Sequence, residues 1–235
     1  MNFLINDKIV NLDIVFDGNL YKYEDKLVNE YGLKYICGID EVGRGPLAGP
    51  LVCCAVIMKN NIRFKYVNDS KKLSKKKLEY AYNEIMNNII CYKIIEVSPK
   101  IIDEINIHQA TVKAMKEALD SLSVTPEFVI TDYVKINSNL PVLSIKKGDS
   151  NSINVACASI IAKVYRDNLM RNYDNIYPGY DFSNNVGYPT AKHKEALKRL
   201  GVTPIHRKTF APVKEIINLK KFSKKGFYGK EINYS

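Results

Sequence analysis

Two adjacent acidic residues stand at the end of a short apolar run, directly before a glycine-rich loop. The run covers residues 35–39, the acids are Asp40 and Glu41, and the loop carries Arg44 between Gly43 and Gly45. Acids at the end of a buried strand are costly without a cationic partner, and a divalent cation bound by carboxylate oxygens supplies one. Backbone N–H groups and a guanidinium in the loop can contact a phosphate. The segment therefore indicates metal-dependent chemistry on a phosphodiester.

The surrounding pattern predicts the elements that would position these residues. A second apolar run, residues 51–58, follows the loop so closely that we expect it to pair antiparallel with residues 35–39. The other predicted elements are strands at 91–97, 127–131 and 141–145, and helices at 21–31, 74–89, 98–122 and 153–173. This order predicts an α/β fold with a mixed central sheet flanked by helices on both faces, and with a small C-terminal helical region. Asp132 then lies at the end of a strand, as Asp40 does, where such sheets place their sites.

Length and composition limit the class of protein. The 235 residues, 46% of them hydrophobic, suit one large domain with a small appendage. A formal charge of +10 favours a polyanionic partner such as nucleic acid, although a lysine-rich bias would give the same charge without one. Five cysteines, none in a Cys-x-x-Cys pair, indicate reduced core thiols. With no membrane-spanning stretch and no signal peptide at the start, we expect a cytoplasmic protein.

Seven segments in series resemble the signature of ribonuclease HII. They are GIDEVGRGPLAGP (38–50), NDSKKLS (68–74), IDEINIHQAT (102–111), KGD (147–149), ASIIAKVYRD (158–167), GYPT (187–190) and HRKTFAP (206–212). They cover about residues 35–213 in order and with ordinary spacing, which chance does not readily produce. The resemblance implies a ribonuclease H-like core, which we place at residues 35–175, after an N-terminal extension at 1–34. A C-terminal helical region at 176–215 and a basic, mobile tail at 216–235 follow.

The resemblance also implies a metal site. The four metal-binding carboxylates of the family fall on Asp40, Glu41, Asp132 and Asp149. Mg²⁺ or Mn²⁺ is the expected cofactor, because both prefer oxygen ligands and two such ions can serve in-line phosphodiester hydrolysis. The chain departs from the bacterial pattern at Tyr133, where glycine is usual, which can alter the loop between the third and fourth acids. Taken alone, the first pair could be exposed turn acids and Asp149 a helix cap.

Substrate contacts follow from the same resemblance. The family's Gly-Arg-Gly loop, here residues 43–45, contacts the 2′-OH and the adjoining phosphate, and its tyrosine, here Tyr188, stacks at the ribonucleotide–deoxyribonucleotide junction. A 2′-OH is the group that distinguishes RNA from DNA at one nucleotide. Lys71 and Lys72 fit phosphate contacts, although a solvated approach to a helix explains them equally well. His206 and Arg207 could touch nucleic acid or support the site.

These assignments predict a monomeric endonuclease whose partners are RNA–DNA hybrid and ribonucleotide-containing duplex DNA. It would cleave the RNA strand of hybrids and nick DNA 5′ to an embedded ribonucleotide, leaving 3′-OH and 5′-phosphate ends. A paralogue that needs a run of ribonucleotides is an alternative within enzymes. A hybrid-binding protein without catalysis is the alternative outside them, and the presence of all four acids argues against it.

Overall fold

The computed structural model describes residues 2–5, 8–12, 18–68 and 73–227, with side chains as far as Leu219. The strands are β1 (Asn2–Ile5), β2 (Lys8–Asn11), β3 (Ile36–Val42), β4 (Leu51–Met58), β5 (Ile89–Val97), β6 (Phe128–Asp132) and β7 (Val142–Ile145). The helices are α1 (Lys22–Asn29), α2 (Lys75–Asn87), α3 (Pro99–Ile105), α4 (Ile107–Asp120), α5 (Gly148–Asn151), α6 (Ile153–Ile176), α7 (Phe182–Asn185), α8 (Ala191–Leu200) and α9 (Ala211–Phe227). Lys71 and Lys72 lie outside the described residues, so their predicted phosphate contacts stay a prediction.

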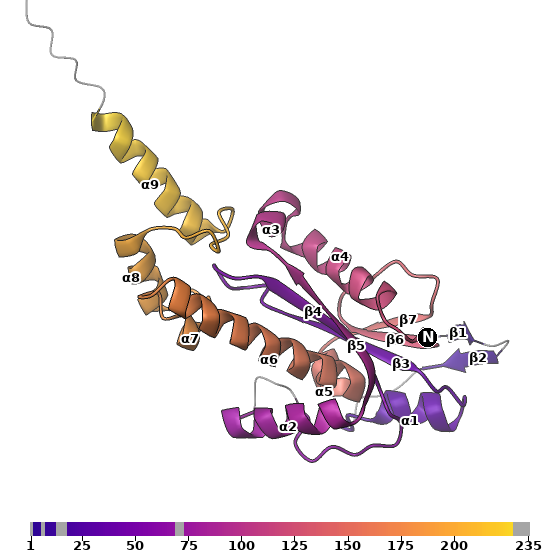
Figure 1. Ribbon diagram of the computed structural model, residues 1–235. Helices are drawn as coiled ribbons and strands as arrows, with labels where there is room; N and C mark the ends of the chain where they lie inside the picture. The colour runs from indigo at the N-terminus through magenta and orange to yellow at the C-terminus, as the bar shows by residue number, and fades with distance from the viewer. Residues whose placement is uncertain (1, 6–7, 13–17, 69–72, 228–235) are drawn as a thin grey trace, which may run out of the picture.

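A five-stranded sheet forms the centre of the fold, with the order β5-β4-β3-β6-β7. Strands β3, β4 and β5 pair antiparallel, whereas β6 and β7 join β3 in parallel. The predicted mixed sheet and its antiparallel first pair are therefore confirmed. Helices α3 and α4 lie on one side of the sheet, and α6 and α2 on the other (Figure 1).

Strand β4 shows why the sheet is covered on both faces. All eight of its residues are buried, and successive side chains of a strand point to opposite faces. Leu51 and Cys53 pack in the cluster that contains Met115 of α4, whereas Val52 and Cys54 pack with the residues of α6 and α2. A continuous apolar run is the pattern expected of such a two-sided strand.

The predicted helix at 98–122 is wrong in one respect, because it is two helices. Asn106 has a positive φ of 65° and separates α3 from α4. Its side-chain oxygen accepts hydrogen bonds from the backbone N–H groups of His108 and Gln109, so it caps the second helix. The local polar bond competes with the apolar periodicity that runs through both segments.

The N-terminal extension is part of the fold rather than a loose lead-in. The hairpin of β1 and β2, which the sequence did not reveal, packs with α1 and the sheet through Ile5, Val10 and Leu27. Phe3 meets Phe128 of β6 edge-to-face, with 5.0 Å between the ring centroids.

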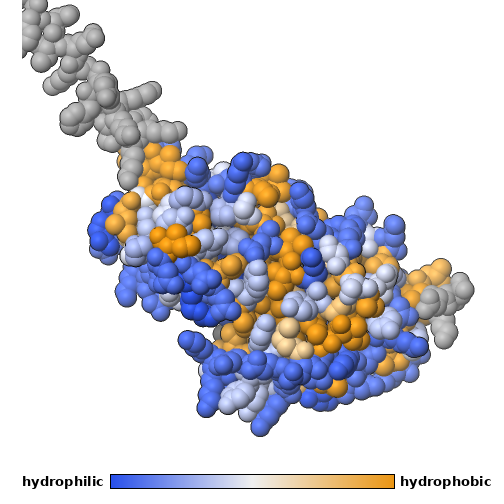
Figure 2. All heavy atoms as spheres, viewed as in Figure 1, coloured by the Kyte–Doolittle hydropathy of each residue, from blue (hydrophilic) through white to orange (hydrophobic). Residues whose placement is uncertain are grey.

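The C-terminal helices form their own small core against the glycine-rich loop. Leu47 and Ala48 pack there with Phe182, Leu197 and Val213. The predicted tail from residue 216 is helical as far as Phe227, since α9 continues through it and points away from the body (Figure 1). The face in view carries apolar side chains along its middle between hydrophilic borders (Figure 2). In the described part of the chain, no helix is long and apolar enough to cross a membrane.

Candidate active site

Three of the four predicted acids lie at the carboxyl ends of two neighbouring strands of the sheet. Asp40 and Glu41 lie near the C-terminal end of β3, and Asp132 is the last residue of the adjacent strand β6. The two strands are parallel, and Ile39 is paired with Thr131, so the acids that follow lie level with each other. All three line one cavity of about 430 Å³. The sheet thus brings these carboxylates together, as predicted.

Asp149 lies beside this group but does not line the cavity. It is buried in the short helix α5, and the N–H of the preceding residue, Gly148, donates a 2.8 Å hydrogen bond to Oδ1 of Asp132. A Cβ on Gly148 would lie 3.1 Å from the Cα of Asp132, so a larger residue would press the two segments apart. The Lys-Gly-Asp turn therefore connects the third and fourth acids through the backbone.

The acids repel one another in a buried setting. Burial raises the pKa of Asp40 well above its usual range, and the nearby charges of Glu41 and Asp132 raise it further. Burial also raises the pKa of Glu41, against the opposing influence of Arg44, whose Nη1 lies 3.2 Å from Oε1. Oε2 of Glu41 is buried and has no hydrogen-bond partner among the described residues. Such a site gains from a cation that would neutralise it.

The donor set fits a hard divalent metal. In the described residues, no three side chains of His, Cys, Asp or Glu already surround one point closely enough to hold an ion. The crowded carboxylates and the unpartnered oxygen of Glu41 nevertheless present the oxygen ligands that Mg²⁺ and Mn²⁺ prefer.

Tyr188 lines the same cavity and lies against the glycine-rich loop. Gly43 has a φ of +95°, which other residues rarely adopt, and it leads the chain out of β3. A Cβ on Gly45 would lie 3.3 Å from Cε1 of Tyr188, so the ring rests against the loop. Tyr188 lines the cavity and is 42% exposed, which leaves a face of its ring open to a ligand.

Helix α6 contributes residues whose importance the sequence did not show. Ser159 lines the cavity, and its hydrogen bond to Asp40 lowers the pKa of that carboxyl. Lys163, one turn later, lines it as well and pairs with Asp167 at 2.9 Å. Spacings of four residues on a helix mark one face, so this signal was present in the chain. Arg166, three residues after Lys163, is fully buried.

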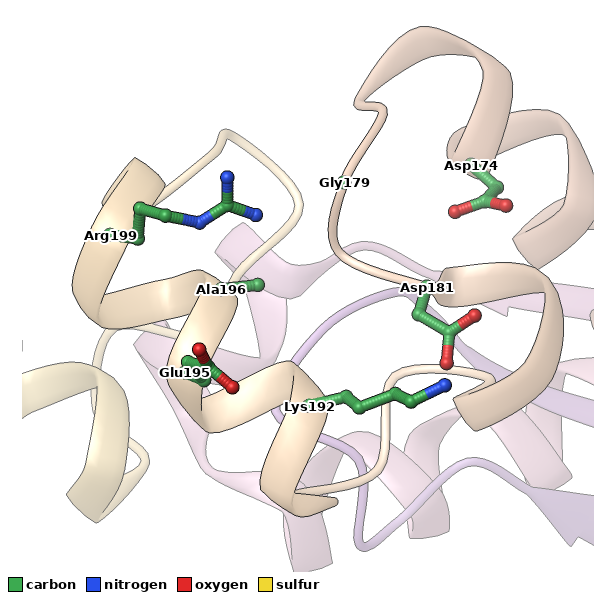
Figure 3. Close-up of a pocket in the computed structure, with 7 residues that line it drawn as sticks. All are labelled: Asp174, Gly179, Asp181, Lys192, Glu195, Ala196 and Arg199. Atoms are coloured by element: carbon green, nitrogen blue, oxygen red, sulfur yellow. The ribbon is translucent and has the colours of Figure 1, made fainter.

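A second pocket lies apart from the acids, among α6, α7 and α8 (Figure 3). Its lining mixes Asp174, Asp181 and Glu195 with Lys192 and Arg199. Asp174 already accepts hydrogen bonds from the N–H of Phe182 and from the hydroxyl of Ser183. Since it contains none of the predicted acids, this pocket is not the candidate site.

Comparisons with known proteins agree with this geometry. The family model described as Ribonuclease HII matches residues 37–213. Ribonuclease HII of Enterococcus faecalis (strain ATCC 700802 / V583) is 51% identical over 186 residues, which are 79% of this chain and 73% of that protein. The crystal structure of ribonuclease H2 from Pyrococcus horikoshii OT3 matches with a TM-score of 0.69 and 26% identity, over 80% of this chain and 99% of that one.

A more distant structure shares the fold. Bst-RNase HIII in complex with Mn²⁺ matches with a TM-score of 0.63 and 20% identity, over 83% of this chain and 73% of that chain. The family model spans most of the chain, including the acids, the loop and Tyr188, and the Enterococcus relative matches 79% of it. The chain therefore belongs to the ribonuclease HII family.

Proposed function

We propose that Asp40, Glu41, Asp132 and Asp149 carry out the hydrolysis by which this ribonuclease HII cleaves RNA in RNA–DNA hybrids, including single ribonucleotides embedded in duplex DNA. The cleavage itself follows from family membership. The assignment of the residues is supported chiefly by the meeting of three acids and Tyr188 around one cavity, with the Gly43–Gly45 loop lying against Tyr188 and paired with Glu41 through Arg44. Acids beside a phosphate-binding loop suit a phosphodiester.

The four carboxylates would hold Mg²⁺ or Mn²⁺. When bound, such ions activate the attacking water and stabilise the leaving oxygen. Ser159 orients Asp40 by its hydrogen bond, and Arg44 orients Glu41 through the 3.2 Å ion pair. These two contacts reduce the freedom of the first acids, so less ordering remains to be done when a substrate arrives.

The chain's own residues bind and orient the substrate. The Gly43–Gly45 loop would contact the 2′-OH and the neighbouring phosphate, and the exposed ring of Tyr188 would stack at the junction. Lys163 reaches the same cavity and can neutralise a phosphate once its pairing with Asp167 loosens. The products would carry 3′-OH and 5′-phosphate ends.

The core and the C-terminal helical region would have separate roles in the same site. The chain would act as a cytoplasmic monomer on ribonucleotide-containing duplexes. Residues 35–175 would form the catalytic core, and residues 176–215 would complete the substrate site through Tyr188. The contact between Gly45 and Tyr188 supports this division of labour, because each part supplies one side of the ribose contact.

Cleavage of a labelled duplex with one ribonucleotide tests the proposal. The parent should cut it when Mg²⁺ or Mn²⁺ is added, and Asp40→Asn should not. Asp120→Asn is a matched control, because this acid is exposed and pairs with Lys116 at the end of α4. Equal cleavage by Asp40→Asn and the parent would refute the metal-site assignment. Binding without cleavage by the parent would favour the binding protein instead.

The length of the ribonucleotide run distinguishes the remaining alternative. The parent is compared on two duplexes that differ only in whether one ribonucleotide or a continuous RNA tract is present. A paralogue that needs a run would cut only the second. Cleavage of both supports recognition of a single ribose by the loop and Tyr188.

A further inference from the structure

Arg207 holds the carbonyl side of the glycine-rich loop. Its side chain is fully buried, and its guanidinium donates to the carbonyl oxygens of Gly43 (2.5 Å), Arg44 (2.9 Å) and Gly49 (2.9 Å). The C=O and N–H of a trans peptide point in opposite directions. The amides of Arg44 and Gly45 therefore point away from Arg207, and within the described residues neither donates a hydrogen bond.

A second guanidinium completes this anchor. Arg166 is also fully buried, and it donates to the carbonyl oxygens of Ala48, Pro50 and Val186. Neither arginine forms an ion pair with an acid of the described residues. Burial and then the charge of Arg166 lower the pKa of Arg207 to about 9, so both cations persist at neutral pH. Charged donors to carbonyls are among the stronger hydrogen bonds.

Two buried histidines hold Tyr188 in the same region. Nε2 of His193 lies 3.1 Å from Nε2 of His206, and Nδ1 of His193 lies 2.9 Å from the carbonyl oxygen of Tyr188. At the other end, the backbone N–H of Thr203 donates to Nδ1 of His206 at 3.0 Å.

The backbone groups at the two ends determine the direction of every hydrogen bond. Nδ1 of His206 must accept, because the N–H of Thr203 can only donate, so the proton of neutral His206 is on Nε2. It donates to His193, whose own proton is then on Nδ1 and bonds the carbonyl of Tyr188. Burial lowers the pKa of both imidazoles, so this neutral relay is the stable form at neutral pH. The relay thus fixes Tyr188 to His206.

His206 and Arg207 are neighbours in the chain, and they join the two systems. The backbone of this pair is itself held to the loop, through a bridge between Ala48 and His206 and a 2.8 Å hydrogen bond from the N–H of Arg207 to Leu47. We propose that His206 and Arg207 are positioning residues that set the spacing between the Gly43–Gly45 loop and Tyr188, and so determine how well the protein distinguishes a ribose from a deoxyribose. The inference rests on the proposed recognition of the 2′-OH by that loop.

The test measures discrimination in binding rather than activity. Two labelled duplexes of one sequence are used, one all DNA and one with a single ribonucleotide, and their Kd values are measured by fluorescence anisotropy. All proteins carry Asp40→Asn, so that neither duplex is cut. The ratio of the two Kd values is compared among the otherwise unchanged chain, His206→Asn, Arg207→Lys and Tyr180→Phe.

The variants are chosen to disturb one contact each. His206→Asn keeps an acceptor for the N–H of Thr203 but removes the donor to His193. Arg207→Lys keeps the charge but loses the planar fork that bonds three carbonyls. Tyr180→Phe removes a buried 2.7 Å hydrogen bond to the carbonyl oxygen of Gly201 but keeps the ring that packs against His193 and His206, and it serves as the control.

We expect His206→Asn and Arg207→Lys to reduce the ratio about tenfold, the size expected for losing a buried hydrogen bond. The Kd for all-DNA duplex should stay within about twofold, and the control should retain the full ratio. Unchanged ratios in both variants would overturn the inference, as would a failure of both to fold, which would make the residues purely structural. If Arg207→Lys alone fails to fold, the ratio of Kd values measured for His206→Asn decides whether the inference holds. If the protein that carries Asp40→Asn alone binds the two duplexes equally, the proposed ribose recognition is refuted instead.

Discussion

Glu24 gives the structure a measurable dependence on pH. This residue of α1 lies at the start of α6, where its Oε1 accepts hydrogen bonds from the hydroxyl of Ser152 (2.5 Å) and the N–H of Asn154 (3.1 Å). Its Oε2 is buried and has no partner among the described residues. Burial raises the pKa of the carboxyl from 4.5 to about 7, and the two hydrogen bonds reduce that rise.

The sign of the effect follows from the raised pKa. The folded state favours the protonated acid, so its contribution to stability is complete below about pH 4.5 and is lost as the pH rises through about 7. At 1.36 kcal/mol for each unit of pKa, the whole effect is about 3 kcal/mol, and most of it falls between pH 5 and pH 8. A glutamine in place of Glu24 cannot ionise, so Glu24→Gln should not lose this stability as the pH rises.

Urea unfolding followed by circular dichroism at about pH 5 and pH 8 measures the contribution of Glu24 to the free energy of unfolding. Between these conditions the free energy of unfolding of Glu24→Gln should shift by about 2–3 kcal/mol in its favour relative to the parent. Glu30→Gln, an exposed position next to the end of α1, measures the background effect of removing a carboxylate. A difference between Glu24→Gln and the parent that does not change with pH would refute the reasoning.

Three further predictions concern the site and the core. Asp40→Asn should lower cleavage of a single-ribonucleotide duplex at least ~100-fold while the circular dichroism spectrum is kept, since it removes a charge that holds the reacting groups; a loss below about tenfold would contradict this role. Gly45→Ala should lower the same activity about tenfold, because its Cβ would lie 3.3 Å from the ring of Tyr188. Gly43→Ala should instead lower the free energy of unfolding, because its Cβ would lie 2.3 Å from Nε of Arg166. The five cysteines are buried and unpaired, so Ellman's reagent should modify none in the native protein and all five in urea; rapid native labelling would show that the core opens.

The sheet was predictable because burial leaves a direct trace in the sequence. Strand β4 is a continuous apolar run and β3 begins as one, and their observed bounds differ from the expected ones by no more than three residues. The hairpin of β1 and β2 left no such trace, since its strands have four residues each and depend on distant contacts such as that of Phe3 with Phe128. Short strands of this kind are stabilised by the partner and not by their own pattern.

The acids were predictable from their place at strand ends, but the anchors beneath the loop were not. Arg207 bonds the carbonyl of Gly43, which is 164 positions away in the chain. A backbone carbonyl is present at every residue, so an arginine that binds only carbonyls has no partner that a sequence could reveal. The same is true of His193, whose acceptor is the carbonyl of Tyr188.

The choice of carbonyls as partners has an electrostatic consequence. A carboxylate would cancel the charge of a buried guanidinium, whereas a carbonyl oxygen satisfies its hydrogen bonds and leaves the charge in place. Arg166 of α6 lines the same cavity as Asp40 and Asp132, so a cation and the acids share one space. A phosphate entering this cavity is attracted by the guanidinium but repelled by the acids. The acids are therefore where a divalent cation is needed, whereas Arg166 keeps its own positive charge because carbonyls and not carboxylates satisfy it.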